Sequence, residues 1–258
     1  MATRVCGIDW ATQPSARAAV ILEDGEAEGE LAVGEIISPL TDERVRELCT
    51  SSDYQVVGVD TPFGWPAAFT QFVSGWTPTG PRTGEVPALC LFQYRLTDRI
   101  VCKEPQKRPL SVSSNLIGLS ARAWVDFVTQ WGLSRQIDVG AGDPEGMPRL
   151  IEVYPGATLA ALFPAGGELK TDRYKNDEEV RARVVDGLLR TFHIHCDEQQ
   201  RRKLISHRSD SDNTDALLAA LTCWCYLGKL DSWSARRPKD AEQDAARQEG
   251  WIFFPTRR

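Results

Sequence analysis

Short apolar runs that end on an acidic or polar residue recur along the first quarter of the chain. The runs at 4–9 (RVCGID), 17–22 (RAAVIL) and 31–37 are separated by polar turns. This pattern predicts three short β-strands joined as an antiparallel meander. The run at 55–60 (QVVGVD) is apolar until its last residue, which is typical of a buried, parallel strand in the middle of a sheet.

Helical spacing of apolar residues dominates the rest of the chain. It predicts helices at 41–49, 88–101, 116–131, 177–192, 197–205 and 213–227. Further strands are expected at 149–153 (RLIEV), which Pro155 stops, and at 251–254. Strands that alternate with helices after an opening meander indicate one α/β domain over 1–258, with a mixed sheet flanked by helices. Residues 67–148, roughly, form a long insert after the fourth strand, irregular where Gly and Pro are frequent.

Four acidic residues stand where a strand ends or a helix begins. Asp9 closes the first run, Asp60 closes the fourth, and Asp212 and Asp215 open the last long helix. A carboxylate at the end of a buried strand is costly to remove from water unless a positive group meets it. The carboxyl ends of strands in α/β sheets also gather where ligands bind. The four acids therefore predict a shared cation, Mg²⁺ or Mn²⁺, because hard oxygen ligands favour these ions over zinc.

Five further residues are candidates for the same site. Glu152 lies near the end of a predicted strand and is a fifth possible metal ligand. Arg95 and Arg99 can bind phosphate, since guanidinium groups bind such oxygens bidentately. Tyr154 and Lys175 are candidates for contact with a substrate.

Each of these assignments has an ordinary structural alternative. Asp212 stands where a helix cap is expected, and Asp215 lies in the first turn, where an acid complements the helix dipole. Asp60 can end its strand in an Asx-type turn. Arg95, with Asp98, can form a surface ion pair of little energetic value.

Charge and composition narrow the range of partners. The net charge of −6 and the pI near 5.2 exclude a uniformly basic surface, so contacts with nucleic acid have to come from local patches. The seven cysteines are scattered in or beside apolar runs, which indicates reduced core residues. The chain starts without a signal-peptide pattern and has no run of about 18 apolar residues. We therefore expect a cytoplasmic protein with no membrane partner.

Six segments carry a family resemblance. They are GIDWA at 7–11, VVGVDTPFGWP at 56–66, YRLTDR at 94–99, IEVYPGA at 151–157, SDSDNTDALLAAL at 209–221 and EGWIFFP at 249–255. In this order and spacing they resemble a family of bacterial and archaeal proteins, filed as a domain of unknown function (DUF), that are predicted to be ribonuclease-H-like nucleases. The resemblance implies a ribonuclease-H-like fold, with a mixed five-stranded sheet that opens in an antiparallel meander.

The same resemblance implies roles for the acids. Asp9 looks like the carboxylate of the first strand in that superfamily and Asp60 like that of the fourth. Asp212 and Asp215, three apart on one helix face, are similar to the acids of its Holliday-junction resolvases. The implied activity is a two-metal nuclease, in which ions about 3.5–4 Å apart activate water and stabilise the leaving oxygen. The implied partner is DNA or RNA, structured or single-stranded, and a homodimer is compatible with the resolvase similarity.

Two other functions fit the same sequence. GIDWATQPSARAAV at 7–20 resembles the first phosphate motif of actin-like ATPases and sugar kinases, which share the opening meander. A complete kinase of that class normally needs two such domains, and no glycine-rich adenosine motif follows the late strands. A ribonuclease-H-like module that binds a partner without cutting nucleic acid is the second alternative.

Overall fold

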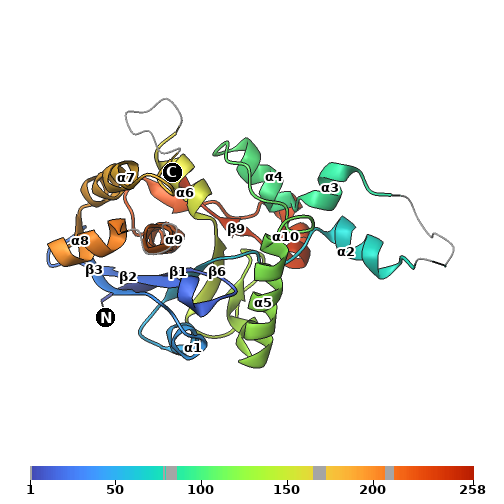
Figure 1. Cartoon of the computed structure of the whole chain (residues 1–258), viewed down its shortest axis with the longest axis horizontal. Helices are drawn as coiled ribbons and strands as arrows, with labels where there is room; N and C mark the ends of the chain where they lie inside the picture. Colours follow the sequence, from blue (N-terminus) through green and yellow to red (C-terminus); the bar gives the residue numbers. More distant parts are fainter. Residues whose placement is uncertain (1, 78, 80–85, 165–172, 207–211) are drawn as a thin grey trace.

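One large sheet organises the molecule (Figure 1). The computed structural model describes residues 2–77, 79, 86–164, 173–206 and 212–258. Within these residues the sheet has eight strands in the order β5-β6-β4-β1-β2-β3-β7, with β9 beside β6. The strands are β1 (Arg4–Asp9), β2 (Ala18–Asp24), β3 (Leu31–Ile37), β4 (Val56–Asp60), β5 (Ile137–Asp138), β6 (Arg149–Val153), β7 (Ile194–His195) and β9 (Ile252–Phe253). A separate two-stranded sheet pairs β8 (Trp233–Ala235) with β10 (Pro255–Arg257).

The opening meander is confirmed. β2 runs antiparallel to both β1 and β3, whereas β4, β6, β5, β7 and β9 pair in parallel with their neighbours. The expected number of five strands is wrong, because β5, β7 and β9 join the sheet as well. Each of these three has only two residues. β9 lies within the strand expected at 251–254, whereas β5 and β7 were not expected, because a run of two residues has no readable alternation.

Helices cover both faces of the sheet (Figure 1). On one face, α9 (Asp212–Leu227) packs across β1, β2 and β4, and α6 (Pro155–Leu162), α7 (Glu178–Thr191) and α8 (Glu198–Ile205) lie around it. On the other face lie α1 (Asp42–Thr50) and α5 (Ile117–Gln130). α9 is buried from Thr214 to Tyr226, as expected for a helix that is apolar on all sides.

The alternation of side chains along β1 and β4 separates two cores. Val5 and Val56 belong to the core beneath α9, whereas Ile8 and Val59 belong to the core beneath α1 and α5. Odd positions of β1 and even positions of β4 thus face α9, because successive residues of a strand point to opposite faces. Both closing residues, Asp9 and Asp60, fall on the α9 face by this count.

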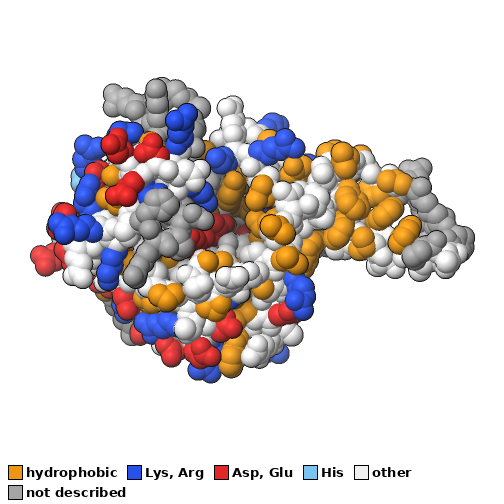
Figure 2. All heavy atoms as spheres, viewed as in Figure 1, with side chains coloured by type: hydrophobic (Ala, Val, Ile, Leu, Met, Phe, Trp, Pro, Cys, Tyr) orange, Lys and Arg blue, Asp and Glu red, His pale blue; other side chains and the backbone are white. Residues whose placement is uncertain are grey.

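The segment between β4 and β6 contains helices that the sequence pattern placed only in part. The helix expected at 88–101 is two helices, α3 (Leu89–Gln93) and α4 (Leu96–Lys103). The break occurs because the Asp98 carboxylate accepts a hydrogen bond of 2.9 Å from the Arg95 backbone N–H, which starts a new helix. α2 (Ala67–Ser74) lies before the Gly- and Pro-rich part of the insert, in a stretch for which the sequence pattern predicted no element. α2 and α3 project from the body, and Figure 2 shows many apolar side chains on their surface.

The remaining elements are short. They are the 3-10 helices η1 (Pro14–Ala16), η2 (Leu133–Gln136) and η3 (Asp240–Glu242), and the helix α10 (Gln243–Glu249). Pro155, expected only to stop a strand, is also the first residue of α6, a position that suits its fixed backbone angle. None of the helices described here has both the length and the apolar character needed to cross a bilayer.

Gly7 allows α9 to lie directly on β1. A Cβ atom at this position would stand 2.1 Å from the Ala216 carbonyl oxygen and 2.2 Å from the Ala220 nitrogen, both of them backbone atoms. Such atoms cannot move unless the whole helix shifts. The small residue is therefore required for the distance between sheet and helix, and with it for the relation between Asp9 and the residues of α9.

We predict that Gly7→Ala destabilises the protein by about 3 kcal/mol or more, because it overpacks a backbone contact. Gly34→Ala is the control, since a Cβ there meets only the end of the flexible Glu23 side chain, at 3.2 Å. It should change stability by about 0.5 kcal/mol or less. Urea unfolding of both variants measures the difference. Equal stability of the two variants would contradict the close approach of α9 to β1.

Candidate metal centre

Asp9 and Asp60 lie side by side at the ends of two central strands. β1 and β4 are parallel, and their register pairs Asp9 with Asp60 directly. Because paired residues of parallel strands point to the same face, both carboxylates extend toward α9. Each side chain is partly exposed at the edge of the sheet.

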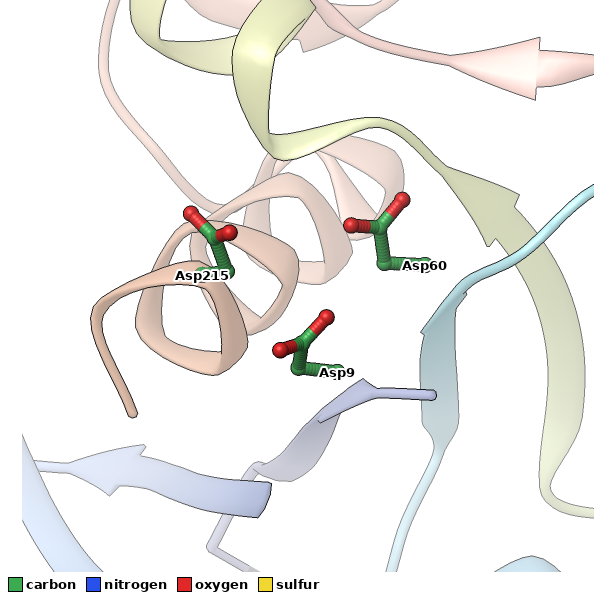
Figure 3. A group of neighbouring side chains, drawn as sticks. All are labelled: Asp9, Asp60 and Asp215. Atoms are coloured by element: carbon green, nitrogen blue, oxygen red, sulfur yellow. The ribbon is translucent and has the colours of Figure 1, made fainter. Parts of the chain in front are cut away.

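Asp215 completes a group of three carboxylates (Figure 3). It lies in the first turn of α9 and is buried, with 2 % of its surface exposed. One oxygen from each of Asp9, Asp60 and Asp215 lies within 4.8 Å of the others. The figure shows the three side chains close together, Asp9 on β1, Asp60 on β4 and Asp215 on α9. We call this group the acid triad.

Two neighbouring side chains hold Asp215. The Tyr174 hydroxyl donates a hydrogen bond of 2.6 Å to its Oδ1, and the Lys175 ammonium lies 2.7 Å from its Oδ2. Tyr174 was not among the residues expected from the sequence, although it directly precedes Lys175, which was. Within the described residues, no side chain donates a hydrogen bond to Asp9 or Asp60. Lys175 is the nearby positive charge in this part of the structure.

Repulsion within the acid triad is visible in the protonation equilibria. Burial raises the pKa of Asp60 to about 8, and the negative charge of Asp215 adds to the effect. The pKa of Asp9 is raised well above its usual value, first by burial and then by the charges of Asp215, Asp60 and Asp212. Burial lowers the pKa of Lys175, but the attraction of Asp215, Asp60 and Asp9 outweighs it and raises that pKa. Three ionised carboxylates would exceed the charge of one lysine, so Asp9 and Asp60 resist ionisation when no cation is bound.

Asp212 stands at the first residue of α9 and is partly exposed. Its charge contributes to the raised pKa of Asp9, so it lies close enough to act on the acid triad. It is not one of the three acids whose oxygens gather within 4.8 Å. Its position allows both of the roles expected from the sequence, a helix cap and a fourth acid near the cation.

Glu152, expected as a further metal ligand, points to the opposite face of the sheet. Its partner in the register between β4 and β6 is Val59, one residue before Asp60. Because side chains alternate along a strand, Glu152 shares the face of Val59 and not that of Asp60. Its carboxylate instead accepts hydrogen bonds from the Arg95 guanidinium at 2.6 and 2.9 Å and from the Phe63 backbone N–H at 2.9 Å.

Arg95 is fully engaged inside the protein, and the expectation of a surface ion pair is wrong. Its guanidinium is 1 % exposed and pairs with Asp98 as well as with Glu152. Two bidentate pairs use the donors that a phosphate would need. Arg99 lies exposed on α4, and it is not part of the pocket wall described below. The structure therefore brings neither arginine to the acid triad.

Glu249 is a second buried acid in this network that the sequence did not single out. Its carboxylate accepts hydrogen bonds from the backbone N–H groups of Ala67 and Leu96, at 2.8 and 2.7 Å. These are the first residues of α2 and α4, so one side chain caps two helices. Together with Arg95 and Glu152, it fixes the chain that follows Asp60.

A pocket of ≈ 370 Å³ opens beside the acid triad. Asp60 and Lys175 belong to its wall, and so does Tyr154. The other wall residues include six from the loop after β4, the segment before α5 and the first turn of α5: Thr61, Pro62, Leu110, Val112, Ile117 and Ser120. Arg95, Asp98 and Glu152 also belong to the wall. Tyr154 and Lys175 thus lie where the sequence placed them, next to the carboxylates.

One protein family matches the chain. Its model covers residues 7–242 and is described as "Protein of unknown function (DUF429)". The match includes the whole acid triad, Tyr174 and Lys175. No curated protein and no solved structure matches the chain significantly.

We predict that Asp60→Asn stabilises the metal-free protein, increasingly so as pH rises. The folded state retains a proton on Asp60 up to about pH 8, whereas the unfolded chain releases it near pH 4. The folded state thus binds more protons across this window, and stability falls as pH rises through it. Asparagine cannot ionise and removes this loss. At pH 8 the melting temperature should rise by about 2–8 °C, which corresponds to about 1–2 kcal/mol.

Thermal unfolding in EDTA between pH 4 and pH 8 measures this effect. Asp53→Asn, at an exposed carboxylate, is the control and should leave the melting temperature nearly unchanged at every pH. A variant Asp60→Asn that is less stable than the wild type at pH 8 would show that the carboxylate is favourably placed without a cation.

Proposed function

The chain belongs to the DUF429 family, and we propose that it is a metal-dependent nuclease that hydrolyses phosphodiester bonds of nucleic acid. The observation that carries the proposal is the acid triad, in which three carboxylates gather at the end of the sheet and two of them resist ionisation in the absence of a cation. A protein gains nothing in stability from such a group. Its presence is understandable if a cation binds there.

The donor set suits Mg²⁺ or Mn²⁺. It consists of carboxylate oxygens alone, and hard oxygen ligands favour these ions over softer metals. The oxygens lie within 4.8 Å of one another, so small side-chain rotations bring them onto one ion. Asp9 stands on the central strand β1 and lies close enough to Asp60 and Asp215 for both charges to raise its pKa, which makes it the best bridging ligand if two ions bind. Asp212 is near enough to serve as a further ligand.

The architecture supports a ribonuclease-H-like assignment. The five longest strands of the large sheet lie in the order β3-β2-β1-β4-β6, with β2 reversed, as the family resemblance implies. The acids stand on the first strand, at the end of the fourth and on a late helix, which are the expected places. This agreement favours a nuclease over an actin-like ATPase, since the described residues contain a single large sheet.

The chain's own residues can prepare a phosphodiester for hydrolysis. When bound, the divalent ions supply an activated water and stabilise the leaving oxygen. Tyr174 orients Asp215 through its hydrogen bond, and Asp215 in turn holds Lys175 at the pocket. Lys175 stays protonated at neutral pH because its pKa is raised, so its ammonium can face the phosphate. Tyr154 forms the adjoining wall of the pocket.

We predict that Asp9→Asn abolishes both Mn²⁺ binding and cleavage. Calorimetry should show the Mn²⁺ affinity falling about a hundredfold or more, since a central ligand is lost. Labelled DNA and RNA incubated in parallel, as single strands, duplexes and branched substrates, should be cut by the wild type only. Asp53→Asn is the control for the removal of one negative charge. Metal binding without any cutting by the wild type would favour a non-catalytic interaction module, and the absence of both would refute the proposal.

We predict that Lys175→Gln separates metal binding from catalysis. The substitution removes the ammonium near the acids, so Mn²⁺ should bind about threefold to tenfold more tightly, as expected for a half-exposed charge. Cleavage should nevertheless become slower, because a positive charge facing the phosphate is lost. Lys103→Gln, at the exposed end of α4, is the matched control. If Lys175→Gln changes neither quantity, the lysine has no part in the site.

A further inference from the structure

Two residues, Asp60 and Lys175, connect the acid triad to the pocket beside it. Asp60 contributes a carboxylate to the acid triad and also forms part of the pocket wall. Lys175, paired with Asp215, lies in the same wall. A phosphodiester held at the acid triad would therefore place one of its attached nucleosides at the entrance of this pocket.

The far walls of the pocket differ from its entrance. Pro62, Leu110, Val112 and Ile117 give it apolar sides, and Tyr154 adds an aromatic ring. Flat apolar and aromatic walls suit the faces of a nucleobase, which stacks on such side chains without regard to sequence. The wall also contains Arg95, Asp98 and Glu152, in which both carboxylates pair with the one guanidinium.

Two hydroxyl groups in the pocket wall can form hydrogen bonds with a ligand. Thr61 Oγ1 and Ser120 Oγ lie 3.1 Å apart and share one hydrogen bond. Each hydroxyl can donate one hydrogen bond and accept two, so the pair retains capacity for a base edge or a sugar hydroxyl. A small apolar pocket with few polar groups is the usual form of a site for one small ligand.

The volume limits what can enter. At ≈ 370 Å³ the pocket is near the lower end of the range for small-molecule sites, about 300–1,000 Å³. It has room for one nucleoside and none for a base pair. A base in a duplex would have to leave its stack to enter, which costs a few kcal/mol, whereas an unpaired base enters without that cost.

We propose that this pocket binds the base and sugar of one unpaired nucleotide next to the scissile phosphate, so that the protein acts on unpaired nucleotides and discriminates against perfect duplexes. The inference rests on the proposed nuclease function and narrows its substrate class. We call the site the nucleoside pocket.

Variants that fill the nucleoside pocket test the proposal. Ile117→Trp and Leu110→Trp place an indole in it from two different segments, so that one remains informative if the other fails to fold. Leu119→Trp is the matched control, because Leu119 lies on the same helix as Ile117 and is about as exposed as Leu110, at 59 % against 57 %, but is outside the pocket wall. Mn²⁺ calorimetry on each variant checks that the acid triad is intact. None of the three positions contributes a ligand.

The substrates are a labelled single strand, the same strand in a duplex, and the same strand with one abasic position. The wild type should cut the single strand at least about tenfold faster than the duplex, and the two filling variants should lose about tenfold in kcat/KM on it, which is within the range measured for stacking of one base. Cutting next to the abasic position should be slow and equal in the wild type and in the filling variants. Leu119→Trp should behave as the wild type.

Fluorescence anisotropy with a short labelled single strand in Ca²⁺ separates this inference from the proposed function. If the wild type cuts nothing but binds the single strand more tightly than the duplex, and the filling variants lose that preference, the pocket assignment stands and the nuclease assignment fails. If the wild type cuts duplex and single strand equally, or the filling variants cut as fast as the wild type, the pocket assignment is overturned. A free nucleoside monophosphate that binds as tightly as the strand would also overturn it, in favour of a small-molecule substrate.

Discussion

Mutual repulsion among Asp9, Asp60 and Asp215 is the constraint on which the rest of the site depends. One oxygen of each carboxylate lies within 4.8 Å of the others at the end of the sheet. Burial first, and then the charges of the neighbouring acids, raise the pKa values of Asp9 and Asp60. Within the described residues, one lysine and one tyrosine offset this repulsion: Lys175 forms an ion pair with Asp215, and Tyr174 donates a hydrogen bond to it. When the three carboxylates are ionised, a divalent cation neutralises the negative charge that the lysine does not offset.

The fold maintains this unfavourable arrangement through contacts elsewhere. The parallel register of β1 and β4 forces two acids side by side, and the absence of a side chain at Gly7 lets α9 bring the third acid against them. On the opposite face, the buried pairing of Arg95 with Asp98 and Glu152 ties the chain after Asp60 to β6. One face of the sheet thus carries three acids beside one lysine, while the other carries two buried carboxylates that both pair with one arginine.

The sequence predicted the parts of the site that depend on local pattern. Asp9 and Asp60 follow apolar runs long enough to be read as strands, and Asp215 lies in the first turn of a helix with clear spacing. Glu152 was assigned to the wrong face of the sheet. The face to which it points follows from its pairing with Val59, and the sequence does not show the register of these two strands. Arg95 was misplaced because the burial of its segment depends on Glu152 and Glu249, residues far away in the sequence. β5 and β7 were not predicted because their strand conformation depends on tertiary pairing. The break between α3 and α4 was not predicted because it depends on one side-chain cap, that of Asp98.

The most direct test of the account is a crystal structure of the wild type grown with Mn²⁺, with data collected to locate manganese by its anomalous scattering. The account predicts an anomalous peak in coordination contact with oxygens of Asp9, Asp60 and Asp215, and a Lys175 ammonium displaced from Asp215. Manganese bound elsewhere, or a crystal without manganese at the acid triad and with the lysine still paired, would contradict the central claim that these three carboxylates form a cation site.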